Sequence, residues 1–141
     1  MNHPLDFAQK LSISYTNVCK PLCHELNIPQ TAFDILMFLG NNPRYQTARD
    51  IVDIRKIKAN LVSVNVDRLV KEGYLRREAD TDRRKTRLIC TEKALPVIAQ
   101  GKALQEKFFK GLFENIPPEQ TDNFFKTLEM INDRLEKEGL L

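Results

Sequence analysis

Apolar residues recur along most of the chain at spacings of three and four, the repeat of a helix with one buried face. A first stripe spans residues 5–26, and a second helix runs to about Leu39, where residues 40–43 (Gly-Asn-Asn-Pro) end it. Pro21 is expected to kink or loosen the first helix, because proline has no N–H for the preceding turn. The first stripe consists of Phe7, Leu11, Tyr15, Val18, Leu22 and Leu26.

Two more helices are predicted before the middle of the chain. Thr47 with Asp50 three residues later resembles a capping box, and Ala48, Ile51 and Val52 would form the buried face of that short helix. A fourth helix is predicted over 58–72, with Gly73 as its stop. Its residues separate onto an apolar side (Ala59, Val62, Val66, Leu69, Gly73) and an outer side (Asn60, Val64, Asp67, Arg68, Lys71).

A β-hairpin follows the fourth helix. Residues 74–78 and 86–91 are strand-like, and the stretch between them is charged and rich in turn formers. Thr91 can cap a fifth helix, with Pro96 tolerated in its first turns. Pro117-Pro118 breaks the chain again before a last helix, whose apolar residues are Phe124, Leu128, Ile131 and Leu135.

The order of these elements is that of a winged helix-turn-helix, so the expected fold class is mainly α with a small β-hairpin wing. We expect a single domain over 1–141, with a winged part at about 28–93 and helices at 1–27 and 94–141 that form a dimer. The last helix has no obvious partner in so small a winged unit, which favours pairing across a two-fold axis. The alternative is that it folds back on its own subunit.

Charge is distributed unevenly. Residues 44–93 hold 14 lysines and arginines against 8 aspartates and glutamates, a net charge of +6, whereas the rest holds 8 basic and 11 acidic residues, a net charge of −3. A localised positive surface indicates a polyanionic partner. No stretch is apolar enough to span a bilayer, and the N-terminus lacks signal-peptide features, so we expect a soluble cytoplasmic protein without membrane contact.

The three cysteines, Cys19, Cys23 and Cys90, have no zinc-ligand spacing and their odd number argues against a disulfide framework. His24 lies beside Cys23, but consecutive helix positions point in different directions, so no metal is expected. There is no glycine-rich phosphate loop and no convincing nucleophile–base pair. An enzyme is therefore the least favoured class, and no cofactor is expected.

Residues 47–94 resemble the core of the MarR family of transcriptional regulators. The matching runs are 67–77 (Asp-Arg-Leu-Val-Lys-Glu-Gly-Tyr-Leu-Arg-Arg), 80–84 (Asp-Thr-Asp-Arg-Arg) and 88–91 (Leu-Ile-Cys-Thr). The family usually shows a similar "DRLxxKGLIxR", then "DxxDRR", then "L-x-LT". The bracketing helices also fit that family, so the resemblance extends over nearly the whole chain.

The resemblance implies a triangular homodimer with interleaved terminal helices. Each winged unit would place its fourth helix in a major groove of double-stranded DNA and its wing in the flanking minor groove. A dimer would then present two half-sites on one face of the DNA, so a pseudo-palindromic operator is expected. Members commonly repress transcription, and many are released by small phenolic ligands or by cysteine oxidation. Two positions depart from the family pattern: Ala94, where glycine is frequent, and Val64, where arginine or a small polar residue is frequent, which leaves the operator sequence open.

Six residues of the fourth helix are candidates for the major groove: Lys58, Asn60, Leu61, Ser63, Val64 and Arg68. Asn60 can bond an adenine edge, and a thymine methyl would cover Val64. Lys58 and Arg68 are expected to contact phosphates, which fix register without reading sequence. Alternatively, Asn60 is simply near the helix start and Val64 is an ordinary exposed valine.

The wing candidates are Asp82, Arg83, Arg84 and Lys85. A narrow minor groove attracts an inserted arginine. The resemblance makes Arg84 the inserted residue, with Asp82 orienting the wing through an arginine. The alternative is a solvated charge run that keeps a hairpin edge from pairing.

Signal sensing is open at this stage. Tyr15, Phe33 and Phe38, together with Phe7 and Phe108, could line a pocket for a small aromatic ligand, although aromatics at such spacings commonly form plain core. Cys19 and Cys23 lie one turn apart on the first helix, where some relatives carry redox cysteines, so a peroxide switch is a further hypothesis. The favoured function is a dimeric DNA-binding repressor. The alternative is a winged-helix module that binds proteins.

Overall fold

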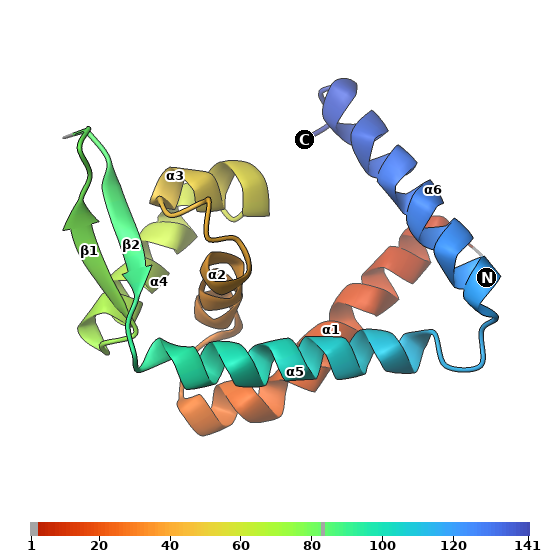
Figure 1. Ribbon diagram of the computed structural model, residues 1–141, viewed down its shortest axis with the longest axis horizontal. Coiled ribbons are helices and arrows are strands. Elements are labelled where there is room, and N and C mark those ends of the chain that lie inside the picture. The colour runs from red at the N-terminus through yellow and green to blue at the C-terminus, as the bar shows by residue number, and fades with distance from the viewer. Residues whose placement is uncertain (1–2, 83) are drawn as a thin grey trace. The chain divides into compact units, whose positions relative to one another are not determined.

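The computed structural model describes residues 3–82 and 84–141 (Figure 1). The described chain is mainly helical with one β-hairpin after α4, which confirms the predicted fold class. It divides into two compact units, Met1–Glu106 and Lys107–Leu141. In the described ranges, no helix combines the length and the apolar character that crossing a membrane requires.

Helix α1 spans Pro4–Leu26, and the ring of His3 accepts a hydrogen bond from the Leu5 N–H at its start. It continues through Pro21, so the expected loosening is not seen as a break in the helix. Pro21 is exposed, as is Asn17 one turn before it, so the Asn17 carbonyl that loses its N–H partner can bond water instead. Asn27, in the left-handed conformation (φ 54°), ends the helix.

Helix α2 (Gln30–Asn41) forms the centre of the first unit and extends two residues beyond the predicted end at Leu39. Seven of its 12 residues are buried: Ala32, Phe33, Ile35, Leu36, Met37, Phe38 and Leu39. The core around it includes Cys19 of α1 and Val97 and Ile98 of α5 (Ala94–Leu112). Helix α1 and the first part of α5 therefore share one core with the helices of the winged part.

The capping box of the third helix is confirmed. The Thr47 hydroxyl accepts from the Asp50 N–H, and the Asp50 carboxylate accepts from the Thr47 N–H, each at 3.1 Å. Helix α3 (Ala48–Asp50) then passes into a π-helical turn, η1 (Ile51–Arg55). Ile51 is fully buried, but Ala48 is exposed, so its predicted place on the buried face was wrong.

Helix α4 (Ala59–Lys71) leads directly into the wing. Strands β1 (Leu75–Ala79) and β2 (Thr86–Cys90) pair antiparallel and lie side by side, from Leu75 opposite Cys90 to Ala79 opposite Thr86 (Figure 1). The Leu88 N–H donates to the Gln46 carbonyl at 2.7 Å, which ties β2 to the segment before α3.

Thr91 was predicted to cap the fifth helix, and this was wrong. Its hydroxyl donates to the Gly73 carbonyl at 2.5 Å, and α5 begins three residues later, at Ala94. Gly73 itself has a φ of 85°, which only glycine adopts without strain, and it ends α4 as predicted. Thr91 therefore closes the base of the wing instead of starting a helix.

The second unit is the end of α5 and helix α6 (Pro118–Lys137). The Phe113 ring packs against those of Phe124 and Phe125, at centroid distances of 5.6 and 5.0 Å. No residue of α6 is buried, and its predicted apolar stripe lies on the surface.

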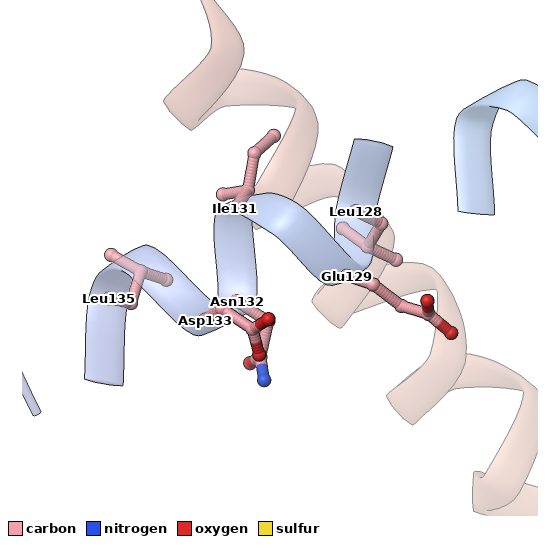
Figure 2. A pocket seen from close by; sticks show the side chains of 6 residues that line it. All are labelled: Leu128, Glu129, Ile131, Asn132, Asp133 and Leu135. Carbon is pink, nitrogen blue, oxygen red and sulfur yellow. The ribbon is translucent and has the colours of Figure 1, made fainter. Parts of the chain in front are cut away.

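A hollow of about 500 Å³ lies along α6. Of the side chains that line it, Figure 2 shows Ile131 pointing to the opposite side of the helix from Asn132 and Asp133. All six residues that line it come from α6: Leu128, Glu129, Ile131, Asn132, Asp133 and Leu135. It is therefore an open face of one helix and not an enclosed site.

Candidate nucleic-acid interface

Helix α4 has one buried and one exposed side, as predicted. Val62, Val66 and Leu69 pack into the core. Five of the groove candidates lie on the exposed side: Lys58, Asn60, Leu61, Ser63 and Val64. Val64 is 66% exposed and Leu61 43% exposed, which is unusual for aliphatic side chains with a core so near. This side therefore carries apolar and small polar groups of the kind that approach base edges.

Asn65 differs from its neighbour Val64. Although polar, it is buried, and its amide donates to the Leu61 carbonyl one turn back at 2.8 Å. Asn65 is therefore satisfied within the helix and is not placed to read bases. Asn60, by contrast, is exposed in the first turn.

The start of α4 is uncapped in the described structure. Lys58 holds the N-cap position and no side chain accepts a hydrogen bond from the first-turn N–H groups. Such N–H groups, together with the positive end of the helix dipole, favour an anion. The exposed Lys58 adds a full positive charge at the same point, which suits a phosphate.

Arg68 lies elsewhere than predicted. Its guanidinium donates to the Asn27 carbonyl at 2.8 Å and to the Glu72 carboxylate at 3.1 Å. These contacts tie the last turns of α4 to the joint between α1 and α2. Arg68 therefore acts as a structural contact here, and its position gives no support to the predicted phosphate contact.

A second ion pair joins α4 to the wing. The Arg77 guanidinium of β1 donates to the Asp67 carboxylate of α4. The sequence pattern did not predict this pair, although both residues fall in the matching run 67–77. It is an exposed contact between β1 and the outer side of α4.

The wing tip is a hydrogen-bonded turn. The Asp82 carboxylate accepts from the Arg84 N–H at 3.1 Å, and the Asp82 carbonyl accepts from the Lys85 N–H at 2.9 Å. Asp82 thus shapes the tip through the backbone and not, among the described residues, through an arginine side chain. Arg83 lies outside the described residues.

Arg84 and Lys85 are exposed, and neither forms an ion pair with any residue that the structure describes. Further down the wing, Glu78 pairs with Arg76 and Arg87, at 3.4 and 3.2 Å. The positive charge of the wing is therefore partly neutralised along its strands and remains available at its tip.

The candidate pocket residues belong largely to the core. Phe33 is fully buried and Phe38 nearly so, with its ring stacked on Tyr45 at a centroid distance of 6.3 Å. A ligand could reach either ring only if neighbouring side chains moved. Tyr15 is half-buried, its hydroxyl accepts from the Gln105 amide at 2.8 Å, and burial raises its pKa to about 12.

The two cysteines of α1 are both buried. The Cys23 thiol lies 3.8 Å from the Gln30 amide oxygen, and burial raises its pKa to about 11. Because the thiolate is the form that reacts with oxidants, this environment opposes the peroxide-switch hypothesis. Within the described chain no three His, Cys, Asp or Glu side chains are grouped to hold a metal ion.

Comparison with known proteins adds to this geometry. The profile of the MarR family matches residues 26–85. A search of curated proteins found no match.

Solved structures resemble nearly the whole chain. A MarR protein from Peptoclostridium difficile is 21% identical, with a TM-score of 0.85 over 98% of this chain and 91% of that one. A Listeria monocytogenes protein assigned to the same family and complexed with 26mer DNA is 16% identical, with a TM-score of 0.86 over 98% and 92%. MepR of Staphylococcus aureus, in a DNA complex, is 14% identical, with a TM-score of 0.81 over 96% and 100%. At such identities these matches show the fold. The fold, the family match at residues 26–85 and the motif at 67–91 agree, and each of them is similar to the MarR family.

Proposed function

We propose that the protein is a dimeric transcriptional repressor that binds double-stranded DNA at a pseudo-palindromic operator. The observation that carries this is the pairing of an exposed α4 side, which holds Asn60, Ser63 and Val64, with a wing tip on which Arg84 and Lys85 are free of ion pairs among the described residues. The first suits a major groove and the second suits a narrow minor groove. Two structural relatives were solved with DNA, which supports the same use of the fold here.

The dimer follows from α6. Phe124, Leu128 and Ile131 are 40%, 45% and 52% exposed, and an apolar stripe of this kind is expected to be covered by a partner. A second copy of the chain offers the same stripe and gives the two-fold symmetry that two half-sites need. The protein would act in the cytoplasm, where its DNA lies, and without enzymatic activity.

Release from DNA is proposed to follow binding of a small aromatic ligand near Tyr15. Tyr15 is a half-buried residue of α1 whose hydroxyl accepts from the Gln105 amide of α5, and a ligand would bind beside this contact between the two helices. Oxidation of Cys19 and Cys23 is the weaker proposal, because both thiols are buried and the pKa of Cys23 is raised. Cys19→Ser and Cys23→Ser variants that bind and release DNA normally would remove it.

The test is binding of the wild-type protein to a duplex that it selects from a random-sequence library, measured by fluorescence anisotropy over a range of salt. We expect a selected sequence with two related half-sites and an affinity that falls steeply with salt, because phosphate contacts release counterions. A protein-interaction module is the alternative function, since winged helices can bind proteins through the same surfaces. For such a module we expect that no DNA sequence is selected and that binding to a protein partner depends little on salt.

A further inference from the structure

Asp34 lies on α2 where α1, α2 and η1 meet, with a side chain only 19% exposed. Its carboxylate accepts a hydrogen bond from the Gln30 amide at 2.9 Å, and the Gln30 oxygen faces the Cys23 thiol of α1. On the other side, the Arg55 guanidinium lies 3.7 Å from the second Asp34 oxygen. These contacts form a continuous polar chain from α1 to the last residue of η1.

In this row of polar contacts, Asp34 and Arg55 are the residues expected to carry a full charge at neutral pH. The titratable groups that face Asp34 from α1 are Tyr15 and Cys23, and burial raises their pKa values to about 12 and about 11, so both stay neutral. Burial also raises the pKa of Asp34, although the Gln30 hydrogen bond and the Arg55 charge oppose this. The ionised carboxylate therefore costs the fold free energy, and such a group is more readily explained by function than by stability.

Arg55 occupies a demanding stretch of backbone. It ends the π-helical turn η1, and Lys56 after it has a φ of 63°, in the left-handed region that glycine favours. Both conformations are costly and persist where the surroundings hold them. Helix α4 begins three residues later, at Ala59, so this backbone sets where the exposed side of α4 starts.

Two ion pairs involve η1 in the described part of the chain. Arg49–Asp53, at 2.8 Å, stays within α3 and η1, whereas Arg55–Asp34 crosses to α2. The Arg55 pair is thus the polar side-chain contact that anchors the turn between η1 and α4, residues 55–58, to the rest of the unit.

The geometry points to Asp34 as a positioning residue for DNA binding. Through Arg55 it holds residues 55–58, and so sets Lys58 and the first turn of α4 against the DNA. Through Gln30 it connects this turn to α1. The inference rests on the proposed function, and it gives a role in DNA binding to a largely buried carboxylate that does not itself touch DNA.

The experiment compares Asp34→Asn, Arg55→Gln and the double variant with Asp53→Asn, which removes the exposed ion pair of the same segment. The probe is the duplex selected by the wild-type protein. We expect Asp34→Asn to bind about three- to thirtyfold more weakly, with a thermal midpoint equal to or above that of the wild type at neutral pH. The double variant should bind no more weakly than Arg55→Gln, because the two residues act through one contact. Asp53→Asn should bind like the wild type.

Two further readouts separate positioning from a structural defect. Amide hydrogen exchange at residues 54–59, without DNA, should be faster in Asp34→Asn and unchanged in Asp53→Asn. Wild-type affinity should fall as Asp34 is protonated on acidification, and Asp34→Asn should lack that component of the pH profile.

Unchanged or tighter DNA binding by Asp34→Asn would overturn the inference, the latter because it would mean that Asp34 withholds Arg55 from a phosphate. Unchanged exchange at residues 54–59 would overturn it as well. A wild-type protein that selects no duplex would instead contradict the proposed function, and the exchange data would then show separately whether Asp34 anchors the turn.

Discussion

Helices α2 and α6 carry apolar residues at similar spacings but use them differently. In α2, seven of 12 residues are buried and four of them, Ala32, Phe33, Ile35 and Leu36, have no exposed surface. In α6, which has 20 residues, none is buried. Periodicity alone does not separate the two cases, because it shows that a helix has an apolar side without showing what covers it.

The difference indicates which of the two units covers its own apolar residues. The first unit holds a core to which α1, α2, α4, the wing and the start of α5 all contribute. The second unit has a small aromatic cluster around Phe113 and an exposed stripe on α6. We therefore expect substitutions in α2 to act on folding and substitutions in α6 to act on association.

The largest effect is expected in α2. Phe33→Ala should lower the free energy of unfolding by about 3–5 kcal/mol, because it removes a fully buried ring from a close-packed core. Denaturant unfolding followed by circular dichroism measures this. Phe33→Leu, which keeps most of the volume, should cost clearly less, and equal costs would show that the site is not tightly packed.

On α6 the expected effect is on assembly. Leu128→Asp combined with Ile131→Asp should abolish the proposed dimer, because each aspartate would place an unpaired charge in an apolar interface. Sedimentation equilibrium at micromolar concentration should then give the monomer mass. Glu129→Ala with Asn132→Ala, on the same helix, is the control and should remain dimeric. A double aspartate variant that still dimerises would place the interface elsewhere.

Two glycines of α5 allow a buried position and an open position to be compared within one helix. A Cβ on Gly101 would meet the Met37 sulfur and lie 3.1 Å from Phe33 Cζ, whereas a Cβ on Gly111 would meet nothing within 4 Å. Gly101→Ala should therefore destabilise by about 1–3 kcal/mol through overpacking. Gly111→Ala should stabilise by up to about 1 kcal/mol, since alanine favours helix. Thermal unfolding of both variants tests this, and effects of the same sign would contradict it.

The smallest effect concerns alkaline pH. The pKa of Cys23 is raised from its ordinary 9.0 to about 11, so the folded state favours the neutral thiol. That contribution to stability is complete below about pH 9 and is lost as pH rises through about 11. Urea unfolding across this range should show a decline that is shallower in Cys23→Ala. An equally steep decline in the variant would assign it to other groups, of which Tyr15 is one.

The sequence was sufficient for elements whose signal is local. Helices α1, α2 and α4, the Thr47 capping box and the Gly73 stop each depend on residues within a few positions of one another, and the structure contains all of them. The predicted stripe of α1 is only partly covered, because Phe7 and Val18 are 45% and 40% exposed. Asp82 lies at the wing tip, where its carboxylate accepts a hydrogen bond from the Arg84 N–H, and among the described residues no arginine side chain pairs with it.

The features that the sequence did not reveal depend on contacts between residues far apart along the chain. Asp34 and Arg55 are 21 positions apart, and Arg68 meets the carbonyl of Asn27 over 41 positions. Helical spacing puts Arg68 on the outer side of α4, and from that position a phosphate contact was predicted. Only the fold brings the α1–α2 joint within its reach. The π-helical turn has no such local signal either, because η1 continues a stripe that reads as ordinary helix.

The central claim is that α4 and the wing tip together bind DNA, and Arg84→Ala tests it most directly. Salt-dependent anisotropy with the selected duplex should show affinity reduced by about 1–3 kcal/mol and a log–log salt slope reduced by about one. Lys102→Ala, which removes an exposed positive charge from α5, is the control and should match the wild type in both. An Arg84→Ala variant with wild-type affinity and slope would contradict the account.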